Sequence, residues 1–288
     1  MSTCLRVYRG VMEDTAPGNG PAGGTSAADL LWRQMLTKPH PQKRRRRIYL
    51  RIPSEPRCKV CAAPFGGIGG EVLSHFGHER WSKNPKYCVG CFGMLRSHHG
   101  GAEVECTLLF ADVRGSTGLA ERMSPRDFNR LMGRFYDASA RVLVDHDAFV
   151  DKFVGDEIIG IFVPSLATEA HARRGVDAAL ELLRATGHGS ADGPWVPIGV
   201  GVNTGVAYVG SIGDEVDTEL TAMGDMVNVT ARLASVAGAG EVLVTASSAA
   251  ATGLSGSLEH RSLELKGKTE TVDVVVLGLP ALAETGAR

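Results

Sequence analysis

The segment FADVRGST occupies residues 110–117, and the segment DKFVGDEIIGIF occupies residues 151–162. Asp112 directly follows an apolar run of strand type, and Asp156 falls in a Gly-Asp turn between two apolar strands. If this hairpin lies beside the first strand, Asp156 comes close to Asp112. Two neighbouring carboxylates repel each other unless a cation neutralises them. Oxygen ligands without His or Cys favour Mg²⁺ or Mn²⁺, and the alternative for each aspartate is a solvated turn residue.

The loop after Asp112 is also suited to phosphate. Gly115, Ser116 and Thr117 lead into a helical run, and backbone N–H groups at the start of a helix can cradle an anion. A glycine-containing turn that binds nothing explains the same residues equally well. The loop therefore indicates a phosphate site only in combination with the two aspartates.

Periodicity beyond these segments predicts an α+β fold, in which helices pack on a mainly antiparallel sheet. A helix is expected to begin at Ser124-Pro125, with Ser as the N-cap and Pro at the first helical position. Thr204-Gly205 is expected to form a turn. The expected strands are 104–111, 148–154, 157–163, 196–202, 206–209, 241–244 and 272–277, and the expected helices are 27–38, 125–146, 168–185 and 224–236.

The organisation of the chain is expected to be modular. Residues 1–51 are interpreted as a mostly disordered segment, and its basic run KRRRR at 43–47 as a solvated, flexible stretch. Within it, Leu30, Leu31 and Met35 would share one side of a short helix. A four-cysteine module over 52–100, a larger domain over 103–279 and a tail over 280–288 complete the predicted division.

The composition excludes some function classes. The formal net charge is -1, so the whole molecule is not biased towards nucleic acid or anionic lipid. No apolar stretch has the length needed to cross a bilayer, and the first residues lack the pattern of a secretory signal peptide. The cytoplasm is the expected compartment.

Four of the six cysteines form two C-x-x-C pairs, Cys58 with Cys61 and Cys88 with Cys91. Without an export signal, this spacing favours a metal over disulfides. Four thiolates make a closed, structural tetrahedral site, with Zn²⁺ the first expectation and an iron–sulfur cluster the second. His75 and His78 lie between the pairs and could replace a ligand, although isolated loop histidines usually do not. Free thiols or a redox pair is the remaining alternative.

Two later segments offer polar groups. In TAMGDMVNVTARL (221–233), Asn228 and Arg232 are four residues apart and would share one face of a helix. Arg presents a planar fork that suits phosphate, although an ordinary exposed helix face explains both residues too. Lys266 and Lys268 flank a glycine in LKGKT, which suits phosphate but is also common in solvated turns.

Taken together, FADVRGST, DKFVGDEIIGIF, TAMGDMVNVTARL and ELKGKT resemble the catalytic domain of class III nucleotidyl cyclases, in the family's order, over about residues 104–278. The resemblance implies a ferredoxin-like cyclase domain that converts ATP to 3′,5′-cyclic AMP and pyrophosphate, in cyclic-nucleotide signalling. The four-cysteine segment resembles a module found ahead of some bacterial cyclase domains.

The resemblance also implies roles for individual residues. Asp112 and Asp156, with the backbone of Val113, would hold two Mg²⁺ or Mn²⁺ ions. Lys152 and Thr221 would select the base, and guanylate cyclases typically carry Glu and Cys at these positions, so ATP is favoured. The remaining implied roles are transition-state stabilisation for Asn228 and Arg232, and phosphate binding for Lys266, with Lys268 as a less favoured substitute.

The implied mechanism is an in-line attack of the 3′-hydroxyl of ATP on its α-phosphorus. One metal would lower the pKa of this hydroxyl, and the second would neutralise the leaving pyrophosphate. In this family the site forms between two catalytic domains, so a chain that carries both residue sets implies a homodimer. The alternatives are a guanylate cyclase, a zinc-ribbon protein that binds nucleic acid through KRRRR, and a domain that binds nucleotide only as a regulator.

Overall fold

The structure is a computed structural model that describes residues 27–38, 43–52, 54, 56–58, 60–81, 87–97, 99–213, 219–254, 258–265 and 270–279. The chain divides into two compact units. The first comprises the described part of Met1–Val104 together with Pro164–Leu166 and Tyr208–Met223. The second comprises the rest of the described chain from Glu105 onward. No helix among these residues is long and apolar enough to span a membrane.

The second unit is built on a twisted, mainly antiparallel sheet, as the sequence predicted. Its strand order is β2-β3-β1-β4-β6-β8-β7, and the pairing of β4 with β6 is parallel. A further strand, β5, pairs with β4 off this path and belongs to the first unit. The strands are β1 (Gly100–Val113), β2 (Phe149–Val154), β3 (Glu157–Phe162), β4 (Ile198–Ile212), β5 (Glu219–Met223), β6 (Val242–Thr245), β7 (Glu259–Leu263) and β8 (Val272–Leu277).

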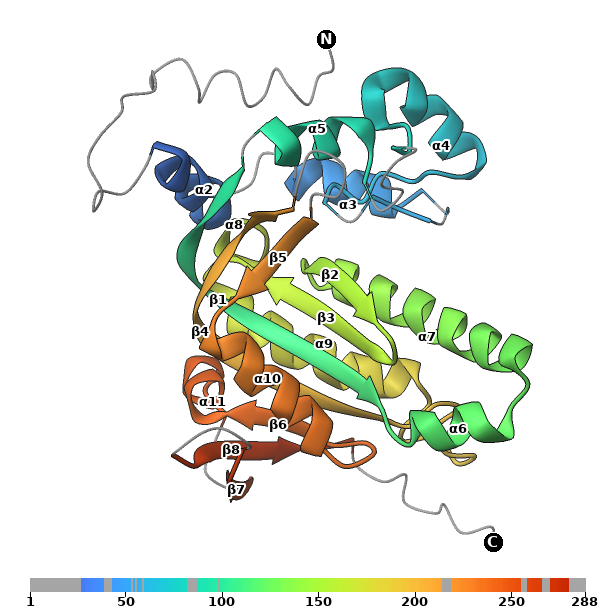
Figure 1. Cartoon of the computed structure of the whole chain (residues 1–288), viewed down its shortest axis with the longest axis vertical. Helices are drawn as coiled ribbons and strands as arrows, with labels where there is room; N and C mark the ends of the chain where they lie inside the picture. Colours follow the sequence, from blue (N-terminus) through green and yellow to red (C-terminus); the bar gives the residue numbers. More distant parts are fainter. Residues whose placement is uncertain are drawn as a thin grey trace, which may run out of the picture. The chain divides into compact units, whose positions relative to one another are not determined.

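Helices cover both faces of this sheet. Figure 1 shows α9 behind the strands and α10 in front of them. Consecutive residues of β4 explain the arrangement, because Gly201 lies so close to the backbone of α10 that a Cβ would clash with it, and Val202 faces Gly175 of α9 on the other side. The helices of this unit are α6 (Ser116–Arg122), α7 (Pro125–Asp145), α9 (His171–Ala185), α10 (Asp225–Val236) and α11 (Ala246–Thr252), with the 3₁₀ turn Thr168–Ala170 before α9. The short helix α8 (Pro164–Ala167) follows β3 in the sequence, and its first three residues belong to the first unit.

The predicted start of α7 is confirmed. The Ser124 side chain accepts a hydrogen bond from the backbone N–H of Asp127 at 3.2 Å, and Pro125 occupies the first helical position. A cap of this kind stabilises a helix by about 1 kcal/mol. The local sequence therefore determines the residue at which α7 begins, after the loop that follows α6.

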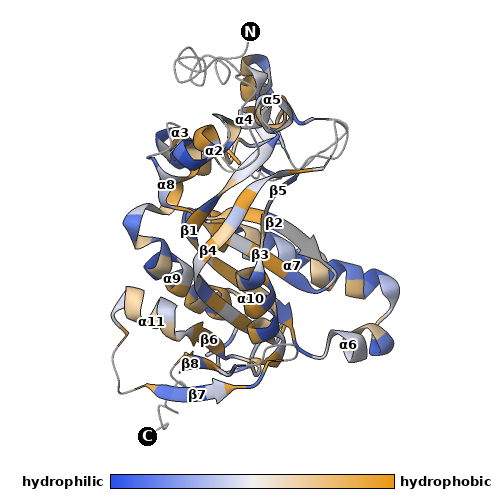
Figure 2. Cartoon of the chain, turned by 60° about the vertical axis from the view of Figure 1, so that its left-hand side comes forward, coloured by the Kyte–Doolittle hydropathy of each residue, from blue (hydrophilic) through white to orange (hydrophobic). Residues whose placement is uncertain are grey.

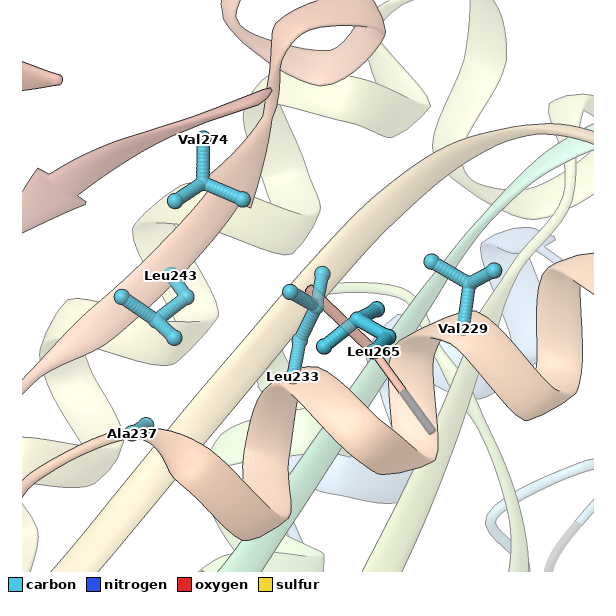
Figure 3. Close-up of a cluster of buried hydrophobic side chains, with 6 residues drawn as sticks. All are labelled: Val229, Leu233, Ala237, Leu243, Leu265 and Val274. Atoms are coloured by element: carbon cyan, nitrogen blue, oxygen red, sulfur yellow. The ribbon is translucent and has the colours of Figure 1, made fainter. Parts of the chain in front are cut away.

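The core of the second unit lies between the sheet and its helices. Figure 2 shows apolar residues concentrated on β1 and β6, and polar residues on the edge strand β7. One cluster packs the apolar side of α10 on β6 and β8, and in Figure 3 Leu265 lies beside Leu233 and Val229 within it. This cluster fixes α10 on the sheet and thereby positions its polar face.

The predicted turn at Thr204-Gly205 is wrong, because β4 runs without a break through both residues. The Thr204 hydroxyl lies 2.9 Å from the Thr107 hydroxyl of β1 and accepts a hydrogen bond from the Ser248 hydroxyl at 2.8 Å. These long-range bonds satisfy a buried Thr within the sheet, whereas the local Thr-Gly pair suggested a turn.

The first unit contains short helices around the cysteines. They are α2 (Ala27–Thr37), α3 (Lys43–Leu50), α4 (Gly67–Leu73), the π-helical turn Ser74–His78 and α5 (Val89–Ser97). The helix expected over 27–38 is present, but its buried residues are Trp32 and Leu36, whereas Leu30 is 49% exposed. The predicted apolar side was therefore displaced from the one that packs.

The basic run also differs from its prediction as a solvated, flexible stretch. Residues 43–47 begin helix α3, and Arg46 is only 1% exposed. Its guanidinium donates a hydrogen bond to the backbone carbonyl of Val60, between the first two cysteines. A buried arginine is tolerated where carbonyl oxygens satisfy its donors, which periodicity alone does not reveal.

Candidate active site and four-cysteine cluster

The pairing of β1 with β3 brings the two predicted metal-binding aspartates to neighbouring positions. Asp112 is the Cα partner of Glu157, the first residue of β3. Asp156 stands one residue earlier, and its backbone carbonyl accepts a hydrogen bond from the N–H of Val113 at 3.1 Å. Both aspartates are half-buried. The strands thus place both carboxylates at the same end of the β1–β3 ladder.

The turn between β2 and β3 explains why the chain reverses there. Gly155 has φ +61°, a left-handed conformation that residues with a Cβ adopt only at a cost. The Tyr136 hydroxyl of α7 donates a hydrogen bond to the carbonyl of Gly155. Burial and the nearby Asp156 carboxylate both raise the pKa of Tyr136. A helix and a turn therefore hold Asp156 in place.

The end of the ladder is rich in negative charge. Burial, and then the charge of Asp156, raise the pKa of Glu157 to about 7. A carboxylate that is desolvated next to another carboxylate is expected to hold its proton more tightly. Added positive charge at this place would relieve the repulsion.

Arg114, to which the sequence pattern assigned no role, supplies one such charge. Its guanidinium forms an ion pair with the Asp112 carboxylate and donates hydrogen bonds to the carbonyls of Ser235 and Ala237. Those carbonyls lie at the C-terminal end of α10, where a cation is favourable. The arginine next to Asp112 in FADVRGST was a visible signal, but its second partner lies more than a hundred residues away.

The other predicted site residues lie on several elements. Asn228 is exposed and Arg232 is half-buried on α10, and Thr221 is buried in β5, within the first unit. Gly115 is the left-handed residue before α6, followed by the half-buried Ser116 and the exposed Thr117. Lys152 belongs to β2 by its backbone, whereas Lys266 and Lys268 lie outside the described residues, directly after the buried Leu265.

In the first unit, the four predicted cysteines form a buried cluster. The Sγ atoms of Cys58, Cys61, Cys88 and Cys91 all lie within 4.8 Å of one another. The Sγ atoms of Cys61 and Cys88 are 3.8 Å apart, too far for a disulfide. Backbone N–H groups of Cys88 and Cys91 donate to the sulfurs of Cys58 and Cys88 at 3.3 and 3.4 Å. The cluster therefore could hold a metal ion.

His78 lies against this cluster rather than in an isolated loop. It is 4% exposed, and its Nδ1 is 3.6 Å from the Sγ of Cys88 and 3.7 Å from that of Cys61. Its Nε2 is 3.1 Å from the hydroxyl of Tyr49. Burial lowers the pKa of His78, which favours the neutral ring. His75, by contrast, is exposed and bonds to the carbonyl of Glu71.

The thiols influence one another's protonation. Burial raises the pKa of Cys58, but hydrogen bonds from the other three cysteines outweigh burial and hold it well below its ordinary value. The pKa of Cys61 is raised, first by its contacts with Cys58 and Cys88. Cys106 lies apart in β1, and burial raises its pKa to about 12, as expected for a core thiol.

Residues 101–278 match the family model of the adenylate and guanylate cyclase catalytic domain, so the chain belongs to this family. A terminal-differentiation-specific adenylate cyclase of Dictyostelium discoideum is 32% identical over 177 residues, which are 58% of this chain and 8% of that protein. Adenylate cyclase 1 of Rhizobium meliloti is 30% identical over 193 residues, 63% of this chain and 29% of that protein. The chain thus spans less than a third of the length of these relatives.

A solved structure gives a similar result for the fold. The guanylyl cyclase Cya2 superposes with a TM-score of 0.57 and 26% identity, over 64% of this chain and 98% of that chain. Adenylate and guanylate cyclases therefore both occur among the proteins that this chain is similar to. The family is established, and the preferred base is a separate question.

Proposed function

We propose that the chain is an adenylate cyclase that converts ATP to 3′,5′-cyclic AMP and pyrophosphate. The observation that carries the proposal is the pairing of β1 with β3, which brings Asp112 and Asp156 to one end of a ladder. Two half-buried carboxylates, beside a glutamate whose pKa is raised to about 7, favour a bound cation.

These residues fit Mg²⁺ or Mn²⁺ because the metal-ligand atoms that they offer are all oxygens. Asp112, Asp156 and the backbone of Val113 would hold two ions. When bound, the ions would lower the pKa of the 3′-hydroxyl and neutralise the leaving phosphates. Asn228 and Arg232 would oppose the charge that grows on the α-phosphate, and one such donor is worth about 3 kcal/mol.

The proposed preference for ATP rests on two residues. Lys152 and Thr221 stand where guanylate cyclases of this family typically carry Glu and Cys. A Lys side chain only donates hydrogen bonds, which suits the ring nitrogen acceptors of adenine. The closest alternative is a guanylate cyclase, since a structure with that activity also superposes on this chain.

We further propose a homodimer with two equivalent sites, since one chain carries both the metal-binding and the transition-state residues.

For the cysteine cluster we propose Zn²⁺. A tetrahedron of Zn–S bonds of about 2.3 Å has edges of about 3.8 Å, the distance found between the sulfurs of Cys61 and Cys88. An iron–sulfur cluster would hold the thiolates further apart, because its own atoms lie between them. Clustered thiols also support the cytoplasm as the compartment.

The decisive experiment incubates the purified chain with Mn²⁺ and either ATP or GTP and identifies the products by mass spectrometry. We expect cyclic AMP and pyrophosphate from ATP, with a much lower rate from GTP. Cyclic GMP as the main product would favour the guanylate cyclase instead. The absence of any cyclic nucleotide at every protein concentration tested would overturn the enzyme proposal.

A further inference from the structure

Tyr87 connects the cysteine cluster to the strand that carries Thr221. It is 1% exposed and directly precedes Cys88. Its hydroxyl accepts a hydrogen bond from the backbone N–H of Leu220 at 3.3 Å, and Leu220 directly precedes Thr221. All of these residues belong to the first unit. One side chain from the cluster thus reaches the main chain next to a proposed base-selecting residue.

The pairing of β5 shows what this bond controls. Leu220 is the Cα partner of Ser211, and Thr221 is the partner of Gly210. In an antiparallel pair, the N–H groups of successive residues point alternately towards the partner strand and away from it. The N–H of Leu220 bonds to Tyr87, so it points to the edge of β5 that lies away from β4. β5 is therefore held from both sides, by β4 along one edge and by Tyr87 along the other.

Tyr87 itself is fixed by the cluster and its aromatic neighbours. Its ring lies 6.4 Å from that of Phe92, which stacks on Trp81 at 5.6 Å. Its carbonyl accepts a hydrogen bond from the N–H of Trp81 at 3.0 Å. The next residue, Cys88, donates its N–H to the sulfur of Cys58 at 3.3 Å. The hydroxyl therefore has little freedom to move independently of the sulfurs.

A second contact acts on the opposite side of Thr221. Gly210, its cross-strand partner, lies against the backbone of Gly100 and Gly101 at the start of β1, with no room for a Cβ at Gly210. A Cβ at Gly101 would likewise come within 2.7 Å of the Cα of Gly210. β1 begins shortly after α5, the helix that contains Cys91. The chain therefore contacts the β4–β5 hairpin around Thr221 at two places, with Tyr87 just before the second cysteine pair and with Gly100 and Gly101 after it.

We propose that Tyr87 is a positioning residue for base selection, which sets the place of Thr221 through the Leu220 amide and makes it depend on the four-cysteine cluster. The proposal rests on the proposed function, in which Thr221 contacts the purine. Tyr87 does not touch the substrate in this scheme. Its loss should therefore act on the choice of nucleotide more than on the rate of the chemical step.

The test compares Tyr87→Phe with Tyr208→Phe in the full chain. The first substitution removes only the hydroxyl and keeps the ring that packs on Phe92. Tyr208 lies on β4 in the same hairpin, and its hydroxyl forms no hydrogen bond within the described part of the chain. For each protein, kcat and KM are measured with ATP and GTP, zinc content by atomic emission, and amide exchange at Leu220 by NMR or mass spectrometry.

For Tyr87→Phe we expect the ratio of kcat/KM for ATP over GTP to fall about three- to tenfold, in line with the loss of one hydrogen bond. The change should lie in KM rather than kcat, and Leu220 should exchange faster while zinc content stays the same. Tyr208→Phe should behave as the unmodified chain does.

An unchanged nucleotide ratio in an active Tyr87→Phe protein would overturn this inference alone. A fall in kcat with an unchanged ratio would also overturn it, because that result describes a general structural role. If the unmodified chain forms no cyclic nucleotide, the proposed function fails and this inference fails with it. Leu220 exchange distinguishes the two cases, because it reports the Tyr87 contact without any turnover.

Discussion

Asp112 and Glu157 are partners across the β1–β3 ladder, so Asp156 falls immediately beyond the last pair of the two strands. The Gly155 turn and the Val113–Asp156 backbone hydrogen bond keep it there. Three carboxylates therefore share one end of the ladder with Arg114, the cation that pairs with Asp112.

Replacing Asp112 by Asn should abolish turnover, by at least about a hundredfold, because the proposed ions lose a charged ligand. The fold should persist, because the relief of carboxylate repulsion offsets the loss of the ion pair with Arg114, which keeps its hydrogen bonds to the carbonyls of Ser235 and Ala237. Cyclic nucleotide formation and thermal unfolding measure the two effects. Asp145→Asn, at an exposed position in the last turn of α7, is the matched control and should retain activity. Substantial activity in Asp112→Asn would remove this residue from the metal site.

Replacing Arg114 by Ala should lower the free energy of unfolding by about 1–3 kcal/mol, since charge-assisted bonds to Asp112 and to the end of α10 are lost. The same change frees the Asp112 carboxylate, so Mn²⁺ should bind more tightly in the absence of nucleotide. Urea unfolding and Mn²⁺ titration by electron paramagnetic resonance test both effects. Arg114→Lys should recover only part of the stability, because Lys lacks the planar fork. Unchanged Mn²⁺ affinity in Arg114→Ala would contradict competition for Asp112.

The raised pKa of Glu157 predicts a dependence of stability on pH in metal-free protein. Its pKa is about 7 in the folded chain and near 4.5 in the unfolded chain, so the folded state binds more protons between these values. The contribution of Glu157 is complete below about pH 4.5 and is lost as the pH rises through 7. Because the side chain is partly exposed, we expect about 1–2 kcal/mol.

Glu157→Gln should remove this part of the slope, which urea unfolding at several pH values would reveal. The control is Glu181→Gln on α9, whose side chain is 45% exposed and pairs with Arg184. If stability depends on pH equally in Glu157→Gln and in the unmodified chain between pH 4.5 and 7, Glu157 does not have the raised pKa. Adding Mn²⁺ should flatten the slope of the unmodified chain.

The cysteine cluster predicts one metal ion per chain. Cys61→Ser should lose this ion, because a hydroxyl is a poor replacement for a thiolate in a closed tetrahedral site. Cys106→Ser is the control, since Cys106 lies in β1 outside the cluster and should leave the metal content unchanged. Atomic emission gives the content and separates zinc from iron. Full metal content in Cys61→Ser would mean that another group, such as His78, completes the site.

Lys152→Ala should weaken base discrimination more than phosphate binding. The kcat/KM for ATP should fall by about tenfold while that for GTP changes little, in line with the loss of a hydrogen bond to a charged donor. Steady-state kinetics with both nucleotides provide the measurement, and pyrophosphate inhibition serves as the control for the phosphate site. An equal loss with ATP and GTP would count against this role for Lys152.

The sequence predicted those features that depend on neighbouring residues. The Ser124-Pro125 cap, the hairpin around Asp156 and the two C-x-x-C pairs were all predictable, because short segments determine them. The Thr204-Gly205 turn was wrong for the complementary reason, since the hydroxyls of Thr107 and Ser248 decide that conformation from distant segments.

The same limit explains what the sequence missed at the candidate sites. Tyr87 and Leu220 are 133 residues apart, and nothing around either residue indicates that they meet. Arg114 was visible beside Asp112, but its bond to Ser235 was not. The site residues that only the structure revealed are therefore those whose side chains connect segments distant in the sequence.

The hydrogen bond from Leu220 to Tyr87 has a practical consequence for anyone who shortens this protein. A truncated chain that starts at β1 would keep the whole matched family region but would lose the Tyr87 hydroxyl, which bonds to the Leu220 N–H on the outer edge of β5. An uncovered strand edge next to buried Leu220 and Ala222 is a template for pairing with another molecule. Such a fragment should aggregate more readily than the intact protein, and poor behaviour in solution would then reflect a lost cover rather than a defective catalytic fold.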